Sequence, residues 1–238
     1  MMCQLRNILP STRTMQRLVI KLSGNLFSTL KSSIENILGI AHALEDIRAA
    51  GSSIIAVAGG GIVARQYIAI GRELGADEAS LDQLGIEVSR LNARIMNLSA
   101  GLADEVPTTL ESIVRASRSE GLVFTGGLSP GQSTNATAAL IAEKTKANLF
   151  INATDVAGVY SADPGKNPNA KLIPKITPRE LRSMLKGQAM QAGTYALMDL
   201  VALKIIERSR VPTRIVKCDP ITLKRAAQGK TVGTLVES

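Results

Sequence analysis

Short apolar runs alternate with segments of helical periodicity along this chain. The apolar runs are rich in branched residues and are bounded by Gly, Pro, Asn or Ser, a pattern typical of strands. Strands are predicted at residues 17–22, 53–58, 122–125, 149–153, 212–216 and 231–236.

The segments between these runs carry apolar residues at three- and four-residue spacing, which predicts amphipathic helices. The first helix is expected to end near Gly51 and uses Ile34, Ile37, Leu38, Ala41, Leu44 and Ile47. Further helices are expected at residues 62–74, 86–98, 133–146, 178–185 and 195–209. The helix at 86–98 counts Ile86, Leu91, Ile95 and Leu98 among its apolar positions.

Strands that are apolar on both faces and separated by helices indicate a mostly parallel sheet covered on both sides. The predicted fold class is therefore α/β. Residues 163–174, which contain Pro and Gly, form the longest irregular loop. This loop is expected to separate an N-terminal part from a C-terminal lobe within one continuous sheet.

Composition narrows the function classes. The chain has 238 residues, of which 45% are hydrophobic and 20% charged, so a globular fold is expected. Its net charge of +8 is dispersed along the chain, and only 3% of residues are aromatic. A nucleic-acid footprint needs clustered positive charge, and single-stranded binding needs stacking aromatics, so no nucleic-acid partner is expected.

The two cysteines and the N-terminal segment bear on the cellular compartment of the protein. Cys3 and Cys218 give neither a disulfide framework nor a metal spacing, so free thiols in a reducing cytoplasm are expected. No apolar stretch is long enough to span a bilayer, so no membrane partner is expected. Residues 1–14 are polar and basic, and Met15 opens the first strand. We interpret residues 1–14 as a disordered extension or a mis-assigned start.

Three consecutive glycines, Gly59-Gly60-Gly61, follow the second predicted strand and precede a helix. Residues without Cβ let an anion approach the backbone N–H groups, and the helix start adds its positive dipole end. Arg65, one turn into that helix, could reach a phosphate. With Ala64 the loop also fits a G-x-G-x-x-A dinucleotide fingerprint, but that motif belongs to the first strand of a βαβ unit. The loop follows the second strand, so a phosphate site is favoured.

Three other polar segments follow predicted strands, where open α/β sheets bind their ligands. Lys21-Leu22-Ser23-Gly24-Asn25 offers a point charge, a hydroxyl and open backbone. Thr125-Gly126-Gly127-Leu128-Ser129-Pro130-Gly131-Gln132-Ser133-Thr134-Asn135 combines a glycine-rich loop with a cluster of helix-capping residues. Thr154-Asp155-Val156-Ala157-Gly158-Val159-Tyr160-Ser161-Ala162-Asp163-Pro164 places Tyr160 where an adenine could stack.

In this order the four segments resemble those of the amino acid kinase superfamily, most closely its uridylate (UMP) kinases of the archaeal type. The resemblance runs from about Met15 to Val236 and includes Gln191-Ala192-Gly193-Thr194-Tyr195 followed by Met198-Asp199-Leu200. It implies a three-layer αβα sandwich that transfers the γ-phosphoryl of ATP to UMP with Mg²⁺, assembled as a homo-oligomer, commonly a hexamer. It also implies one domain over residues 15–238, with acceptor binding in about 15–150 and ATP binding in about 151–238.

Carried over position by position, the resemblance implies roles for individual residues. Lys21 would stabilise the phosphoryl group in flight, and Lys204 would be a second phosphate-binding lysine. Residues expected to contact ATP are Gly24, Asn25, Gly61, Arg65, Thr154, Tyr160 and Asp163. Residues expected to contact UMP are Gly60, Asp82, Gly127, Leu128, Ser129, Pro130, Gly131, Gln132 and Ser133. No residue is assigned as a metal ligand, because Mg²⁺ is expected to arrive with ATP.

Two positions depart from the family pattern. Asn135 stands where relatives often carry Asp, and Ala157 replaces an acid while Asp155 is gained. These departures leave alternatives open: reduced activity, a compensating role for Asp155, or altered metal handling. Another kinase of the superfamily, such as a carbamate or acetylglutamate kinase, and a catalytically weak nucleotide- or anion-binding storage protein on the same scaffold are the competing functions.

Overall fold

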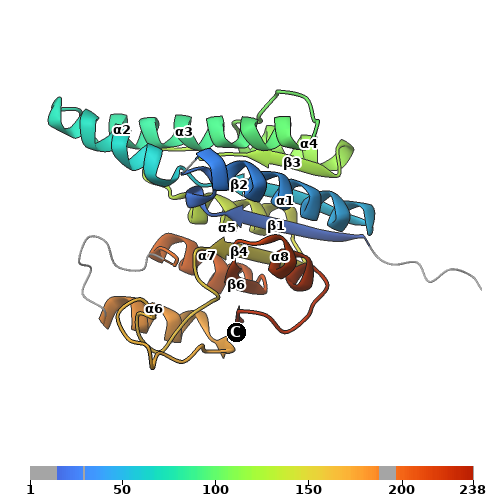
Figure 1. Cartoon of the computed structure of the whole chain (residues 1–238), viewed down its shortest axis with the longest axis vertical. Helices are drawn as coiled ribbons and strands as arrows, with labels where there is room; N and C mark the ends of the chain where they lie inside the picture. Colours follow the sequence, from blue (N-terminus) through green and yellow to red (C-terminus); the bar gives the residue numbers. More distant parts are fainter. Residues whose placement is uncertain (1–14, 29, 188–196, 238) are drawn as a thin grey trace, which may run out of the picture.

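A seven-stranded sheet forms the middle layer of the protein (Figure 1). The structure, a computed structural model, describes residues 15–28, 30–187 and 197–237. The strand order is β3-β2-β1-β4-β6-β7-β5. The strands are β1 (Gln16–Leu22), β2 (Ser52–Ala58), β3 (Leu122–Thr125), β4 (Leu149–Thr154), β5 (Lys175–Ile176), β6 (Thr213–Lys217) and β7 (Thr234–Val236). The pairings from β3 through β6 are parallel, β7 is antiparallel to β6, and β5 is parallel to β7. The predicted mostly parallel, continuous sheet is confirmed.

Helices cover both faces of this sheet, as the αβα expectation requires (Figure 1). They are α1 (Leu30–Ala49), α2 (Gly61–Glu73), α3 (Glu78–Ser99), α4 (Leu110–Ser119), α5 (Thr134–Thr145), α6 (Pro178–Gly187), α7 (Leu200–Ser209) and α8 (Pro220–Ala227), with a short 3₁₀ helix η1 (Gly24–Phe27). Buried side chains of α1, α3 and α8 share one cluster, and those of α4, α5, α6 and α7 share the other.

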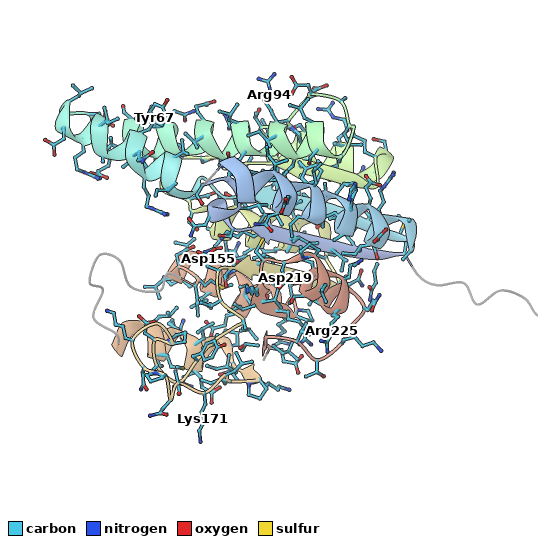
Figure 2. All side chains as sticks on the ribbon, viewed as in Figure 1. Tyr67, Arg94, Asp155, Lys171, Asp219 and Arg225 are labelled. Atoms are coloured by element: carbon cyan, nitrogen blue, oxygen red, sulfur yellow. The ribbon has the colours of Figure 1, made fainter. Side chains whose placement is uncertain are left out.

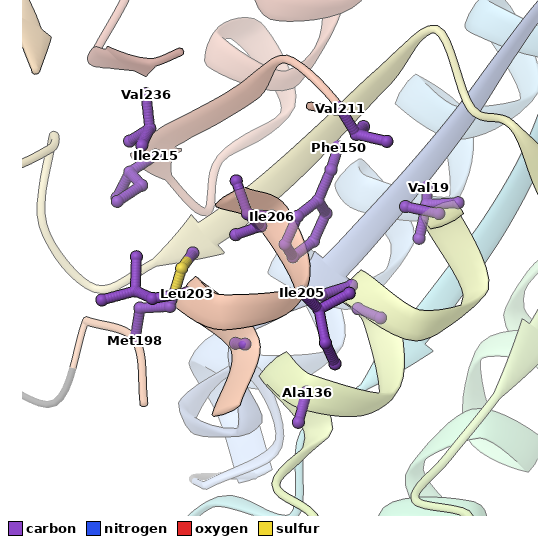
Figure 3. Close-up of a cluster of buried hydrophobic side chains, with 14 of the residues drawn as sticks. Val19, Ala136, Phe150, Met198, Leu203, Ile205, Ile206, Val211, Ile215 and Val236 are labelled. Atoms are coloured by element: carbon purple, nitrogen blue, oxygen red, sulfur yellow. The ribbon is translucent and has the colours of Figure 1, made fainter. Parts of the chain in front are cut away.

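Successive side chains along each strand point to opposite faces of the sheet and so contribute to two separate cores. On β1, Leu18 and Ile20 face the α1–α3–α8 layer, whereas Val19 faces the α5–α7 layer. Figure 3 shows the second of these clusters, where Phe150 of β4 packs with Val19 and Ile206. Lys21 follows Val19 by two residues, so its side chain leaves the sheet on the same α5–α7 side.

Several elements differ from the sequence prediction. Helices α4 and α8 and the two-residue strand β5 were not predicted, because α4 and α8 are short and carry few apolar residues in a row. Helix α3 begins at Glu78 rather than residue 86, since the Asp77 carboxylate accepts a hydrogen bond from Ser80 N–H and caps its first turn. Helix α7 begins at Leu200, and the earlier residues of the predicted 195–209 helix partly fall outside the described residues.

The apolar positions predicted for α3 are only partly buried, with Ile86 4% exposed but Ile95 36% exposed. Leu91 and Leu98 are 55% and 68% exposed. The buried face of this helix instead includes polar residues, among them Ser89, Asn92 and Asn97. Hydrophobic periodicity identified the helix and the buried Ile86 but not the rest of its buried face, because buried polar groups there bond to neighbouring loops.

The prediction for residues 1–14 lies outside the described residues. Among the residues that are described, no helix combines the length and the apolar content that a bilayer crossing needs.

Candidate active site

The four polar segments meet at the carboxyl edge of the sheet, where β1, β2, β3 and β4 end in register with one another. Because these strands are parallel, their following loops emerge on the same side, the usual ligand side of an open α/β sheet. Asp155, on the loop after β4, marks this edge in Figure 2. The contacts described next show how these segments are joined.

The loops after β1 and β2 touch backbone to backbone. A Cβ added to Gly24 would stand 2.1 Å from Gly61 N, and one added to Gly61 would stand 2.2 Å from Gly24 O. Gly61 also has a φ of +67°, which disfavours any residue with a side chain. Gly59 N–H donates to Leu22 O at 3.0 Å, which ties the start of the triple-glycine loop to the end of β1. Both positions therefore require glycine.

Lys21 lies at the end of β1 beside a buried amide. Its register partner on β4 is Asn152, which is fully buried and donates through Nδ2 to Leu197 O at 2.7 Å. Burial lowers the pKa of the Lys21 ammonium, while the nearby Cys218 and Asp155 act in the opposite direction. Burial also raises the pKa of the Cys218 thiol to about 11, so this cysteine is an uncharged neighbour of Lys21 at neutral pH.

A chain of hydrogen bonds runs from Asp155 to Arg65. The Asp155 carboxylate accepts from Ser23 Oγ at 2.6 Å and from Asn25 Nδ2 at 2.5 Å. Asn25 Oδ1 in turn accepts from the Arg65 guanidinium at 3.3 Å. Asn25 and Arg65 are exposed, so their polar groups border the open edge of the site. The arrangement holds a guanidinium and open backbone N–H groups at one place, as a polyphosphate requires.

The N-termini of α5 and α7 converge on the same face. Ser133 Oγ caps α5 by accepting from Ala136 N–H, and it donates to the Asp199 carboxylate. Asp199 caps α7 by accepting from Val201 and Ala202 N–H at 2.9 Å each. Two helix N-termini that point toward one region favour negative charge there. Asn135, in the first turn of α5, is buried, and its Oδ1 has no hydrogen-bond partner among the described residues.

The glycine-rich loop after β3 is fastened to α3. A Cβ on Gly126 would stand 2.6 Å from Arg90 N and from Ser89 Oγ, so the loop backbone lies directly on the helix. Gly127 N–H donates to Ser89 Oγ at 2.7 Å, and Arg90 Nε donates to Gly127 O at 3.2 Å. The structure thus brings this loop to the same helix that flanks the triple-glycine loop.

Asp82 reaches the tip of that loop from the start of α3. Its carboxylate accepts from Gly131 N–H at 2.6 Å. The structure therefore joins Asp82 with the predicted acceptor segment, although 49 residues separate the two. Ser129, Pro130 and Gln132 lie on the exposed part of the same loop.

The predicted adenine segment follows β4. Thr154 is buried, and its Oγ1 donates to Val156 O at 3.0 Å, which turns the chain away from the sheet. Tyr160 lines a small apolar cavity between this loop and α6, together with Leu181 and Met184. Asp163 lies farther along and accepts from Gly165 N–H at 2.9 Å through its side chain. Thr154 ends β4, and Tyr160 and Asp163 lie on the loop after it, but the three residues are not in one hydrogen-bonded cluster among the described residues.

Lys204 stands apart from the other predicted residues. It lies on the exposed face of α7, one turn beyond the helix start, and no hydrogen bond between described residues connects it with Lys21. Its role as a second phosphate-binding lysine stays a prediction.

Sequence reasoning did not identify the supporting residues Ser89, Arg90, Asn92 and Asn152. Asn92 is buried and donates through Nδ2 to Gly59 O at 2.8 Å. Polar residues within an apolar helix or strand pattern are the one signal that could have found them, since buried polar groups need partners.

The chain is similar to known proteins over most of its length. Residues 16–217 match the model of the amino acid kinase family. The chain is 41% identical over 225 residues to a uridylate kinase of Sulfurisphaera tokodaii, covering 93% of this chain and 99% of the relative. It is 39% identical over 222 residues to a uridylate kinase of Archaeoglobus fulgidus, covering 92% and 99%.

Solved structures agree with these relatives. The crystal structure of uridylate kinase from Archaeoglobus fulgidus matches with a TM-score of 0.82 at 37% identity, covering 92% of this chain and 99% of that one. UMP kinase from Bacillus anthracis matches with a TM-score of 0.77 at 21% identity, covering 93% and 96%, and supports the fold alone. The glycine-lined sheet edge and the similarity over almost the whole chain show that this protein belongs to the amino acid kinase family.

Proposed function

We propose that this protein transfers the γ-phosphoryl group of ATP to UMP, giving UDP and ADP. The observation that carries the proposal is the backbone contact of Gly24 with Gly61 beside Lys21, at the carboxyl edge of the sheet. Similarity to archaeal uridylate kinases over more than nine-tenths of the chain supports UMP as the acceptor.

The donor side is assigned to the loops after β1, β2 and β4. Gly24, Asn25, Gly61 and Arg65 would contact the phosphates of ATP, and Lys21 would neutralise charge on the phosphoryl group as it moves. Thr154, Tyr160, Asp163 and Lys204 would complete the ATP site. Support comes from the Asp155–Asn25–Arg65 hydrogen-bond chain, which fixes the guanidinium beside the glycine contact.

The acceptor side is assigned to α3 and the loop after β3. Gly60 and Asp82 would meet UMP, and the loop would enclose its phosphate and base through Gly127, Leu128, Ser129, Pro130, Gly131, Gln132 and Ser133. Support comes from the bonds that fasten this loop to α3 at both ends. The domain is accordingly divided into an acceptor part, about residues 15–150, and an ATP part, about 151–238.

Phosphoryl transfer depends on the positioning of the substrates and the neutralisation of negative charge more than on a covalent intermediate. An oxygen of the UMP phosphate attacks the γ-phosphorus of ATP, the bond to the bridging oxygen breaks, and ADP leaves. Lys21, Arg65 and the two helix N-termini would stabilise the negative charge spread over the transferring group. Lys21 must be protonated for this role, so its lowered pKa sets an upper pH limit for turnover.

Mg²⁺ is proposed to enter with ATP. Mg²⁺ keeps several waters and is commonly held by one or two carboxylates together with substrate phosphates. Asp155 fits this need, because its exposed carboxylate lies at the sheet edge among Ser23, Asn25 and Lys21. The bound cation would neutralise part of the negative charge on the phosphates of ATP.

We also propose that the protein is a cytoplasmic homo-oligomer, with a hexamer as the expected form. The two outer helices carry an exposed apolar face, which we call the α2–α3 face and define by Tyr67, Ile70, Leu74, Leu91 and Leu98. Tyr67, labelled on α2 in Figure 2, is 53% exposed. Exposed large apolar residues gathered on neighbouring helices favour a protein contact there.

The activity is tested with purified protein, Mg-ATP and a panel of acceptors that includes UMP, CMP, carbamate and acetylglutamate. UDP formation with UMP is expected, and Lys21→Met should abolish it while preserving the length of the side chain. Turnover of a non-nucleotide acceptor with none for UMP would contradict the proposal. Tight ATP binding without turnover of any acceptor would instead favour the storage-protein alternative, which Asn135 and Ala157 keep open.

A further inference from the structure

We propose that one turn of α3 sets the distance between the acceptor loop and the triple-glycine loop, with Asn92 and Ser89 as its positioning residues. This inference rests on the proposed function, because it concerns where the acceptor phosphate is held relative to the line of transfer. Neither residue touches substrate in this proposal. Each acts through the loop backbone that it holds.

Asn92 holds the triple-glycine loop. Its side chain is buried, and Nδ2 donates to Gly59 O at 2.8 Å and lies 3.5 Å from Gly60 O. Both neighbours are carbonyl oxygens, so the side-chain nitrogen must face them. Glycines have the greatest backbone freedom of all residues, and a fixed donor restricts that freedom where the loop passes between two substrates. Gly60 is also close to α3 itself, since its Cβ would meet Gly85 O at 3.4 Å.

Ser89 holds the acceptor loop. It is fully buried, accepts from Gly127 N–H at 2.7 Å and donates to Ile86 O at 2.6 Å. The bond to Ile86 O fixes the hydroxyl hydrogen, so the Ser89 oxygen presents its lone pairs to Gly127. The close packing of Gly126 against Arg90 N leaves the loop no room to move inward.

The two side chains are three residues apart, so they lie on the same face of α3, about one helical turn from each other. One rigid element therefore fixes the two loops relative to each other. Near-attack geometry is sensitive to misplacement, and a shift of about 1 Å can cost about 100-fold in rate. Loss of either hydrogen bond should for this reason affect turnover beyond its effect on folding.

The chain contains a matched control for each residue on the same helix. Asn97 is also buried and donates through Nδ2 to a loop carbonyl, that of Glu105, at 3.1 Å. Ser99 donates to Met96 O at 2.8 Å, as Ser89 does to Ile86 O, but it has no loop N–H bonded to its hydroxyl among the described residues. The control residues share the chemistry and the helix but support no proposed substrate loop.

The experiment measures kcat and KM for both substrates, together with the melting temperature, in Asn92→Ala, Asn97→Ala, Ser89→Ala and Ser99→Ala. We expect Asn92→Ala to lower kcat about 10- to 100-fold. Ser89→Ala should raise the KM for UMP about tenfold and leave the KM for ATP unchanged. The two control variants should change the melting temperature alone.

Equal kinetics in Asn92→Ala and Asn97→Ala, at comparable melting temperatures, would overturn the proposal. If Asn92→Ala does not fold, Asn92→Ser replaces it, because the shorter hydroxyl can bond within its own helix but does not span to Gly59. Wild-type turnover of UMP is measured in the same series. Its absence would refute the proposed function, whereas normal wild-type turnover with unaffected variants would refute the positioning role alone.

Discussion

Asp155 accepts a hydrogen bond from the Ser23 hydroxyl at 2.6 Å and so joins the loops after β1 and β4, although 132 residues separate the two. The family resemblance implies an acid at the position of Ala157 instead. Here Asp155 reaches the strand-end loop beside Lys21, and it favours the charged form of that lysine. The geometry supports a compensating role for Asp155.

Asp155→Asn should lower kcat about tenfold, because the amide can accept only one of the two hydrogen bonds and no longer offsets the burial of Lys21. The pKa of Lys21 is already lowered, and removing a nearby negative charge lowers it further. The alkaline limb of the pH profile of kcat should therefore move to lower pH. Asp104→Asn, which changes an exposed carboxylate paired with Arg94, is the control. An unchanged alkaline limb would exclude coupling between Asp155 and Lys21.

Gly61→Ala should reduce kcat by more than about 100-fold, because the new methyl group would stand 2.2 Å from Gly24 O and would push the two loops apart. Gly75→Ala provides the control. Gly75 also has a positive φ, +81°, but a Cβ there meets no atom within 4 Å. Both variants should lose roughly 1–2 kcal/mol of stability through backbone strain. Gly61→Ala should lose more than Gly75→Ala because of the backbone clash with Gly24, and only Gly61→Ala should lose activity. Similar kinetics in the two variants would show that the loop contact is not needed.

Ser133→Ala should weaken UMP binding and destabilise the fold by about 1 kcal/mol, because it removes the cap of α5 and its link to Asp199. Thr109→Ala removes a comparable cap from α4, a helix to which no substrate contact is assigned, and serves as the control. Denaturant unfolding measures the stability of both variants, and steady-state kinetics measure the KM for UMP. A raised KM in both would attribute the effect to general loss of stability.

The α2–α3 face should form a subunit interface. Leu98→Arg, at a side chain that is 68% exposed, should shift the protein toward smaller species in analytical ultracentrifugation, because a charge would be buried in the contact. Ile221→Arg, at a 69% exposed side chain on α8, should leave the mass unchanged. A wild-type monomer at micromolar concentration would contradict the proposed assembly.

Cys218 should resist alkylation near neutral pH, because burial raises the pKa of its thiol to about 11 and little thiolate forms. In a Cys3→Ser background, iodoacetamide labelling of the folded protein should be slow at pH 7 and should accelerate as pH rises toward that value. The pKa of this thiol is higher in the folded state than in the unfolded state. The unfolded state therefore loses its proton first as the pH rises, and the folded state loses stability relative to it. The free energy of unfolding should accordingly fall between about pH 9 and 11. Rapid labelling at pH 7 would contradict the protonated state of this thiol.

The sequence predicted the sheet and the order of its loops with few errors. Strands such as β2 and β4 are continuous apolar runs because both of their faces are covered, and that property is visible in the residues themselves. The importance of the glycine positions could also be predicted from the sequence. Gly24 and Gly61 are explained by the close approach of their two backbones, and Gly61 also by its positive φ. Short elements such as α4 and α8 were missed because their periodic signal extends over too few residues.

What the sequence alone determined is the α/β class, the family resemblance and the set of loops at the sheet edge, because each follows from local pattern and from residue type. Only the tertiary structure decided how these loops are held. Asp155 meets Ser23, and Asn92 meets Gly59, through hydrogen bonds between segments that are distant in sequence. Such pairings depend on how helices and strands pack in space, and the periodicity of a single helix, as α3 shows, does not reveal which of its faces will be buried.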